Sequence, residues 1–293
     1  MNDKFYLLTA LAAAIEAGRA MLEVYRSPDF KVEEKADKSP LTLADKCSHE
    51  IIVKRLGKLD VPILSEEGKD IPYKQRKRWE TYWLIDPLDG TKEFIKKNGE
   101  FTVNIAIIRD RNPAAGVICV PDKNVLYWAL KNQGSFKIDS GDSVNQLETD
   151  LIELLNNQAV GPGNEKIAEV FDGIIAASAK LPVIDLPARP FTIIGSRSHA
   201  SPELEAFVEE KRQEHGEVEF ISAGSSLKLC LVAEGKADIY PRTGPTMEWD
   251  TAAGQAIAEN AGCKVLQYDT IEPLIYNKEN LLNPWFVVLR RNG

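Results

Sequence analysis

The distribution of apolar and polar positions divides the chain into two parts with different secondary structure. Apolar residues recur at helical spacing over residues 5–25 and again after Thr42. Between residues 101 and 138, short apolar runs alternate with turns rich in Asn, Asp, Gly and Pro, which is typical of an antiparallel meander. From Phe191 onward strands alternate with helices, as in an α/β unit. We therefore predict an α+β part followed by an α/β part, with sheets covered by helices.

The predicted boundaries follow from this pattern. Helices are expected at residues 5–25, 42–59, 167–177, 201–215, 227–234 and 249–262, and strands at 60–65, 82–85, 101–108, 116–121, 125–130, 134–138, 191–195, 218–221 and 237–240. Residues 139–187 are interpreted as an insertion or inter-domain segment, which places an N-terminal domain at 1–187 and a C-terminal domain at 188–293. The basic segment 74–78 is expected to be an exposed surface loop.

Residues 83–91 combine an apolar strand with acidic side chains that could bind a cation. An apolar strand ends in Asp86, Pro87, Leu88 and Asp89, and Gly90-Thr91 then suits the start of a helix. Carboxylates at a strand end beside the N–H groups of a helix start would suit a hard cation and an anion together.

Three further carboxylates each have a structural alternative. Thr42 and Asp45 match a capping box, Glu66 precedes a glycine turn, and Asp250 suits a helix N-cap. Considered together, these residues lie at predicted strand ends and helix starts, which converge at one edge of a layered α/β fold. Oxygen ligands of this kind suit Mg²⁺. The set therefore predicts a magnesium site.

Composition excludes several other classes of protein. The net charge of −8 argues against a basic nucleic-acid or membrane surface, so bound phosphate would have to be neutralised locally. The four cysteines form no CxxC pair and the three histidines no HxxxH pair, which argues against zinc and disulfides. The N-terminus lacks a signal-peptide pattern, and no transmembrane segment is expected. These features favour a cytoplasmic protein, and peripheral association with the inner membrane stays open.

The motifs also resemble a known family. Residues 86–91 together with Trp249-Asp250-Thr251-Ala252-Ala253-Gly254 are similar to the paired signature of the inositol monophosphatase superfamily of lithium-sensitive, Mg²⁺-dependent phosphatases, and residues 42–45 and 65–67 match its other site segments in order. The resemblance implies a layered αβαβα sandwich of the sugar-phosphatase type and two or three Mg²⁺ ions.

Within that superfamily the chain resembles the bacterial CysQ-type 3′(2′),5′-bisphosphate nucleotidases. The similarity rests on residues 92–95, 98–104, 224–228 and 240–242. It implies hydrolysis of adenosine 3′,5′-bisphosphate to AMP and phosphate, and a link to sulfur assimilation. Two departures are the longer segment 139–187 and the charged Glu248 before Trp249, where an uncharged residue is more usual.

The resemblance also implies roles for individual residues. Metal ligands would be Glu66, Asp86, Asp89, Asp250 and the carbonyl of Leu88. Asp86 would bridge two ions, Glu67 would support the ligands, and Thr91 paired with Asp45 would orient and deprotonate the attacking water. The substrate would meet Glu66, Leu88, Asp89, Gly90, Thr91, Ser196, His199, Ser225, Lys228, Arg242 and Asp250.

Three alternatives remain at this point. The substrate could be inositol monophosphate or fructose 1,6-bisphosphate, or the chain could be a non-catalytic nucleotide-binding regulator. The partner expected in every case is a small molecule rather than a nucleic acid. The oligomeric state and the preference between adenosine bisphosphate and its sulfated relative are not predicted.

Overall fold

The computed structural model describes residues 3–27, 33–34, 40–68, 70–156, 164–183, 189–196 and 201–290. The helices are α1 (Asp3–Arg26), α2 (Leu43–Leu56), α3 (Tyr73–Arg76), α4 (Thr91–Ile95), α5 (Gly141–Asn156), α6 (Glu165–Ala176), α7 (Pro202–His215), α8 (Leu227–Glu234) and α9 (Glu248–Asn260), with short 3₁₀ turns η1 (Glu66–Gly68) and η2 (Pro121–Lys123). The strands are β1 (Glu33–Glu34), β2 (Pro40–Leu41), β3 (Ile63–Ser65), β4 (Thr81–Asp89), β5 (Thr102–Arg109), β6 (Asn112–Val120), β7 (Val125–Leu130), β8 (Gly134–Ile138), β9 (Ala179–Leu181), β10 (Phe191–Ser196), β11 (Val218–Ala223), β12 (Ile239–Arg242), β13 (Lys264–Gln267) and β14 (Phe286–Leu289).

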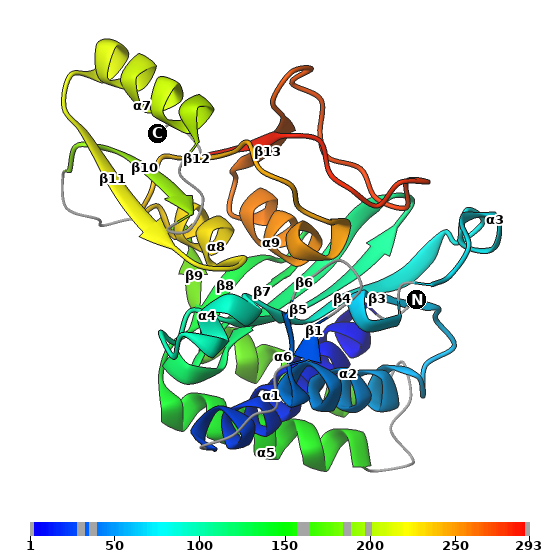
Figure 1. Cartoon of the computed structure of the whole chain (residues 1–293). Helices are drawn as coiled ribbons and strands as arrows, with labels where there is room; N and C mark the ends of the chain where they lie inside the picture. The colour runs from blue at the N-terminus through cyan, green and yellow to red at the C-terminus, as the bar shows by residue number, and fades with distance from the viewer. Residues whose placement is uncertain are drawn as a thin grey trace.

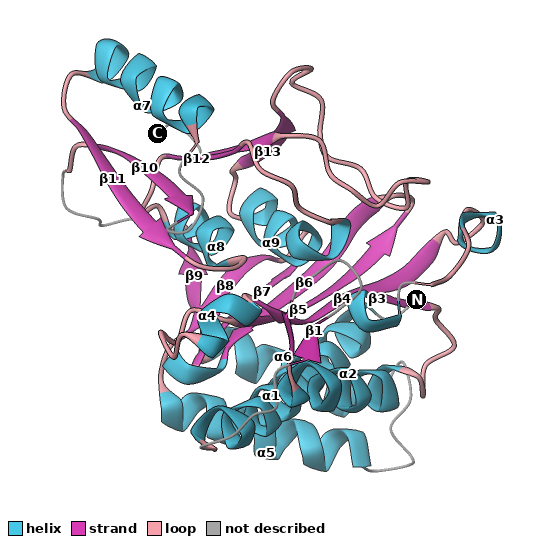
Figure 2. Cartoon of the chain, viewed as in Figure 1, coloured by secondary structure: helices cyan, strands magenta, loops and turns pink. Residues whose placement is uncertain are grey.

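Helices and sheets alternate in five layers (Figure 1). Helices α1, α2, α5 and α6 cover one face of a seven-stranded sheet, and α8 and α9 lie between that sheet and a five-stranded sheet. Helix α7 packs on the outer face of the smaller sheet. Figure 2 shows the same layering by element type. The predicted αβαβα sandwich is confirmed.

The two sheets differ in the way their strands connect. The large sheet runs β3-β4-β5-β6-β7-β8-β9 in chain order, with β3 and β4 parallel and the other neighbours antiparallel. The small sheet has the order β11-β10-β12-β14-β13, in which β10 pairs in parallel with β11 and β12. The first is the predicted meander and the second the predicted α/β unit. Strands β13 and β14, each of four residues, were not predicted.

Separate apolar clusters fill the spaces between the layers. One joins α1, α2, α5 and α6 to the large sheet, a second surrounds α8 and α9, and a third joins α7 to the small sheet. Within the described residues α1 alone is long and apolar enough to span a membrane, although 72% of its apolar window is buried inside the fold. A buried core helix passes the same test of length and composition, so this is weak evidence for a membrane span.

Residues 139–187 are integrated into the layers rather than standing apart from them. Helix α5 places Val144, Leu147, Leu151 and Leu154 at helical spacing in the cluster that contains α1, and β9 extends the large sheet by pairing with β8. The described part of this segment thus contributes to the layers, and its interpretation as an insertion or inter-domain segment stays a prediction. The domain boundary near residue 187 stays a prediction.

The basic segment 74–78 also differs from its expectation as an exposed loop. Residues 73–76 form the helical turn α3, and Arg76 is only 3% exposed. Its guanidinium donates to the side chain of Asn277 and to the backbone carbonyls of Lys278 and Glu279. These acceptors come from a segment 200 residues away, which local sequence patterns cannot indicate.

The close approach of α9 to the large sheet gives a stability prediction. A Cβ atom on Gly116 of β6 would lie 2.5 Å from the carbonyl oxygen of Ala253 and 2.9 Å from the Cβ of Ala256. We expect Gly116→Ala to lower the free energy of unfolding by about 1–3 kcal/mol because α9 must shift. The matched change Gly173→Ala in α6 meets nothing within 4 Å and should stabilise by up to about 1 kcal/mol. Urea unfolding of both variants tests this, and equal effects would contradict it.

Candidate active site

The end of β4 places two carboxylates side by side through a local irregularity. Asp86 pairs with Asn104 and Asp89 with Thr102, so the register with β5 shifts between them. Residues three apart on a regular strand face opposite sides, and a bulge re-aims one of them. Asp86 Oδ1 also accepts from the N–H of Leu88 at 3.1 Å, which holds the turn in place. Burial, followed by repulsion from Glu66 and Asp89, raises the pKa of Asp86 well above its usual range.

Asp89 is held from the opposite side by the turn before α8. Its Oδ2 accepts from the N–H of Ser226 at 2.5 Å and from Asn104 Nδ2 at 3.4 Å. Ser226 Oγ donates to Asn104 Oδ1 at 2.7 Å and lies 2.8 Å from Thr102 Oγ1. Burial raises the pKa of Asp89 to about 6, even though the nearby Lys228 ammonium lowers it.

The buried polar group of Thr102, Asn104 and Ser226 was not predicted to take part in the site. A signal for two of its members is present in the sequence. Thr102 and Asn104 are polar residues two apart in an otherwise apolar strand, and this spacing puts them on one face. No comparable local signal links them to Ser226, which lies more than 120 residues further on.

Asp250 lies in the first turn of α9. The helix begins at Glu248, two residues before Asp250, so Asp250 is not the N-cap residue that its sequence context suggested as an alternative. Its Oδ2 accepts from the N–H of Met247 at 2.9 Å, as the third residue of a capping box does. Burial, followed by the charge of Asp89, raises the pKa of Asp250 to about 8.

Glu66 reaches the same site from the neighbouring strand. Parallel pairing of Ser65 with Ile85 places Glu66 beside Asp86, and the two carboxyl groups share a hydrogen bond. The adjacent Glu67 acts electrostatically on His49, whose Nδ1 lies 2.9 Å from Ser65 Oγ. The structure thus brings together the four carboxylates predicted as metal ligands. Nowhere in the described residues, however, do three His, Cys, Asp or Glu side chains form a group that could hold a metal ion by themselves.

Asp45 makes both of the contacts considered for it from the sequence. Its Oδ2 accepts from the N–H and the hydroxyl of Thr42, each at 2.7 Å, which completes the capping box of α2. Its Oδ1 lies 3.4 Å from Thr91 Oγ1, and the Leu88 carbonyl oxygen lies 3.5 Å from the same hydroxyl. Capping and pairing therefore use different oxygens of one carboxylate. Ser48, three residues after Asp45, donates to the carbonyl of Pro87 at 2.7 Å and ties α2 to this turn.

The residues predicted to contact substrate surround a second, cationic region. Gly90 has φ +90°, and a Cβ there would lie 3.1 Å from the carbonyl oxygen of Glu100 and 3.3 Å from the Cβ of Ser225. The ammonium of Lys228 donates to the carbonyls of Ala223 and Ser225. Burial, together with the charge of Arg242, lowers its pKa to about 8 against the opposing effect of Asp89.

The remaining predicted contacts are less completely described. Parallel pairing of Ser196 with Ala223 puts Ser196 next to the 224–226 turn. His199 lies outside the described residues. Among the described side chains, Ser225 Oγ and Arg242 Nε are buried without a hydrogen-bond partner. Buried polar atoms are normally satisfied, so both atoms are available to bond a water or a ligand in this region.

A strand-end carboxylate cluster between two sheets, with a cationic region beside it, is the site of a phosphate-processing enzyme. The family model for the inositol monophosphatase family matches residues 3–285, and the chain belongs to this family. The curated 3′(2′),5′-bisphosphate nucleotidase CysQ of Shigella flexneri is 42% identical over 280 residues, which cover 94% of this chain and 96% of the relative.

Solved structures agree with this assignment. CysQ from Bacteroides thetaiotaomicron, described as a bacterial member of the inositol monophosphatase family, superimposes with a TM-score of 0.83 at 46% identity and covers 99% of this chain and 98% of its own. The extragenic suppressor protein SuhB of Bartonella henselae shares the fold, with a TM-score of 0.67 at 22% identity, covering 97% of this chain and 92% of its own.

The raised pKa values predict how stability depends on pH. Because the folded-state pKa of Asp250 lies above its ordinary value, its contribution to stability is full below about pH 4 and is lost as the pH rises through about 8. In a chelator, Asp250→Asn should therefore increase the free energy of unfolding at pH 8.5 relative to wild type, and less so at pH 5.

The exposed residue Asp139 provides the control for this prediction. Its side chain is 64% exposed, so Asp139→Asn should change stability little at either pH. Urea unfolding monitored by circular dichroism at both pH values gives the comparison. A lower stability of Asp250→Asn than of wild type at pH 8.5 would contradict the pKa assignment.

Proposed function

We propose that this protein is a Mg²⁺-dependent 3′(2′),5′-bisphosphate nucleotidase that removes the 3′-phosphate of adenosine 3′,5′-bisphosphate to give AMP and phosphate. The observation that carries the proposal is the position of two cations, Lys228 and Arg242, against the carboxylate cluster. Their charges act on Asp89 and Asp250, respectively. A substrate with two phosphates can place one at the carboxylate centre and the other near these cations. The 42% identity to curated CysQ nucleotidases supports the same substrate.

The donor set fits magnesium. Asp86 is buried, Asp89 and Asp250 are half-buried, and the charges of Asp89 and Asp250 contribute to the raised pKa of Asp86, while the Leu88 carbonyl belongs to the same turn. Magnesium is commonly held by one or two carboxylates together with waters and substrate phosphate, so it does not need three side chains at one point. Glu66, Asp86, Asp89, Asp250 and the Leu88 carbonyl would hold such ions, and Glu67 would support these ligands. When bound, such ions would neutralise phosphate charge and make a water molecule more acidic.

Thr91 and Asp45 are suited to orient the attacking water and to accept its proton. The Thr91 hydroxyl lies between Asp45 Oδ1 and the Leu88 carbonyl, so it can accept from a water while donating to Asp45. The water oxygen forms a bond to phosphorus as the bond from phosphorus to the ribose 3′-oxygen breaks. Gly90 and Thr91 would offer N–H groups to the phosphate. Ser196, Ser225 and His199 are assigned to the nucleoside side.

Substrate preference tests the proposal directly. With Mg²⁺, kcat/KM for adenosine 3′,5′-bisphosphate should exceed that for inositol 1-phosphate and for fructose 1,6-bisphosphate. Lys228→Met should lower kcat/KM for the bisphosphate by about 10- to 100-fold, because a hydrogen bond to a charged group is worth about 1.5–3 kcal/mol. The same variant should change little for inositol phosphate.

Phosphate release measured on all three substrates provides this comparison. Asp89→Asn is the negative control and should abolish release from each of them. Preference for inositol phosphate, or an equal loss on every substrate in Lys228→Met, would contradict the proposal. Tight binding of adenosine bisphosphate without phosphate release would instead support a regulatory protein.

The Thr91–Asp45 pair gives a separate prediction. Thr91→Val keeps the shape of the side chain and removes the hydroxyl, so kcat should fall by about 10²- to 10⁴-fold with little change in KM. Thr91→Ser keeps the hydroxyl and should retain most of the activity. Steady-state measurement of kcat and KM for the two variants at saturating Mg²⁺ tests the role of the hydroxyl. Comparable kcat values for the valine and serine variants would exclude the assigned role.

A further inference from the structure

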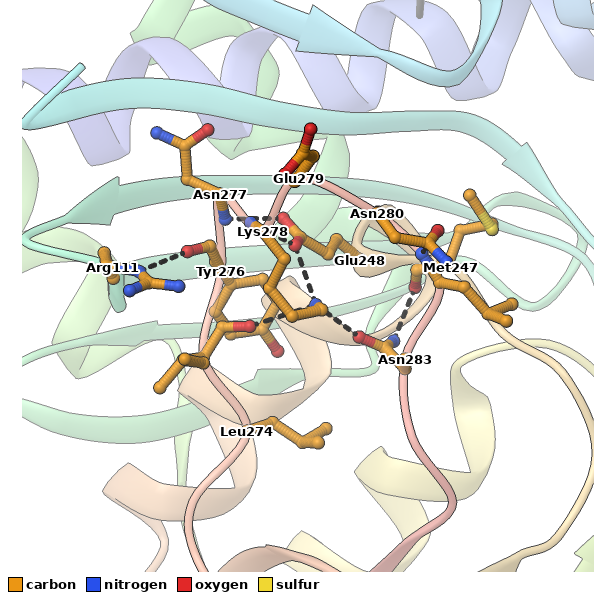
Figure 3. Close-up of polar contacts among 12 residues, drawn as sticks. Arg111, Met247, Glu248, Leu274, Tyr276, Asn277, Lys278, Glu279, Asn280 and Asn283 are labelled. Carbon is orange, nitrogen blue, oxygen red and sulfur yellow. Dashed lines mark hydrogen bonds and ion pairs between the residues drawn. The ribbon is translucent and has the colours of Figure 1, made fainter. Parts of the chain in front are cut away.

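The start of α9, which carries Asp250, is held by a segment from the C-terminal part of the chain, the 276–283 loop (Figure 3). The N–H of Asn283 donates to the carbonyl of Thr246 at 2.8 Å, and the N–H of Glu248 donates to the carbonyl of Leu281 at 2.9 Å. The Asn283 side-chain amide donates to the carbonyl of Met247 at 2.8 Å. Three consecutive residues before and at the helix start are thus fixed by one loop.

Glu248 anchors that loop. Its side chain is fully buried, at 0% exposure, and its carboxylate accepts three hydrogen bonds. Oε2 accepts from the N–H of Asn277 at 2.7 Å, and Oε1 accepts from the N–H of Lys278 at 2.9 Å and from its ammonium at 2.7 Å. Figure 3 shows the carboxylate directed at these donors. Arg76 holds the same two loop residues from another side, through Asn277 Oδ1 and the Lys278 carbonyl.

This arrangement leads to the Asp250 carboxylate through the peptide group between Thr246 and Met247, whose carbonyl accepts from the N–H of Asn283 and whose N–H donates to Asp250. The Met247 residue whose carbonyl is bonded by Asn283 also donates its N–H to Asp250 Oδ2 at 2.9 Å. Glu248 and Asp250 are two positions apart on a helix, so their side chains leave it about 200° apart. Glu248 therefore acts from behind the helix, while Asp250 is in electrostatic contact with Asp89 and Glu66.

A contribution to stability alone does not explain why a charged side chain is buried at Glu248. Burying a carboxylate carries a large desolvation penalty, and replacing a buried ion pair by apolar side chains is often neutral or stabilising. What an apolar residue could not provide is a set of acceptors for two successive backbone N–H groups of the 276–283 loop. The charge instead fixes a defined loop geometry, and that geometry sets the position of Met247.

We propose that Glu248 is a positioning residue for Asp250. It anchors the 276–283 loop, the loop fixes the backbone at Thr246 and Met247, and the Met247 N–H orients the Asp250 carboxylate toward a divalent cation. The inference rests on the metal assignment of the proposed function, and it deepens that assignment by naming the residues on which the geometry of Asp250 depends.

The test is direct binding of Mn²⁺, measured by calorimetry on the full chain without substrate. Glutamine at 248 keeps one acceptor oxygen but turns an NH₂ group toward donors, so it cannot satisfy the loop. Glu248→Gln should weaken Mn²⁺ binding by about 10- to 100-fold, the usual effect of losing an outer partner of a metal ligand.

Glu234→Gln is the matched control. Glu234 is also buried, at 1% exposure, and is paired with the Lys236 ammonium at 2.7 Å and with the hydroxyl of Tyr127. It belongs to the end of α8 and has no contact with the start of α9 among the interactions of the described residues. Its variant should lose thermal stability as Glu248→Gln does, yet bind Mn²⁺ within about twofold of wild type.

The outcomes separate this inference from the proposed function. Unchanged Mn²⁺ affinity in Glu248→Gln, or an equal loss in Glu234→Gln, would overturn the positioning role. If Glu248→Gln does not fold, Asn283→Ala decides. It removes the side-chain bonds to Met247, Thr246 and Thr251 and the contact with the Lys278 ammonium, while the Glu248–Lys278 ion pair stays. It should weaken Mn²⁺ binding by about tenfold, and wild-type affinity would overturn the inference. Weakened Mn²⁺ binding in a protein whose wild type releases no phosphate would uphold the role of Glu248 and reject the nucleotidase.

Discussion

Repulsion among closely placed carboxylates is the constraint on which the rest of the site depends. Asp86 is buried, Asp89 and Asp250 are half-buried, and the charge of Glu66 contributes to the raised pKa of each of the three. This repulsion would favour a different arrangement unless each carboxylate were held. Each of them accepts a hydrogen bond from a backbone N–H, contributed by Leu88, Ser226 and Met247, respectively. Those three N–H groups belong to the β4 bulge, the turn before α8 and the start of α9. The large sheet and the two helices packed on it, α8 and α9, are therefore needed to assemble the cluster.

The same hydrogen bonds join the carboxylate centre to the cationic region. The turn that donates the Ser226 N–H to Asp89 also contains Ser225 and leads within two residues to Lys228. The Lys228 ammonium in turn donates to the carbonyl of Ser225. A movement of this turn would change the environment of Asp89 and the position of Lys228 together. The turn that contains Ser225 and Ser226 therefore joins the two regions through hydrogen bonds.

The sequence was sufficient to predict the ranges of those helices and strands that are bordered by clear turn residues. Strands β7 and β8 and helix α8 match their predicted ranges because turn residues border them, such as Gly235 after α8. Strands β13 and β14 are too short for a periodic pattern. The buried position of Arg76 could not be seen, because its acceptors lie some 200 residues away.

The residues of the candidate site also differ in whether the local sequence could identify them. Local spacing identified Asp86 and Asp89, whereas the pairing of Asp45 with Thr91 came from the family resemblance and is seen as a 3.4 Å contact. Local reasoning alone favoured a cap for Asp45, and this was incomplete because a carboxylate has two oxygens that can serve different partners. The roles of the metal ligands and substrate contacts stay predictions. Ser226 was missed because its link to Asp89 exists only in the folded chain.

The charged residue before Trp249 is explained by where the negative charges of α9 are placed. A helix N-terminus favours carboxylates, and the first turn of α9 carries two, Glu248 and Asp250. One is neutralised by Lys278 and by two loop N–H groups on one side of the helix. The other is left with a single N–H bond and a raised pKa, in contact with other carboxylates. The ion-paired carboxylate of Glu248 needs no further cation, whereas that of Asp250 does. The first turn of α9 therefore carries one structural charge and one charge that is available to a ligand. A charged residue before Trp249 is thus compatible with a working metal site.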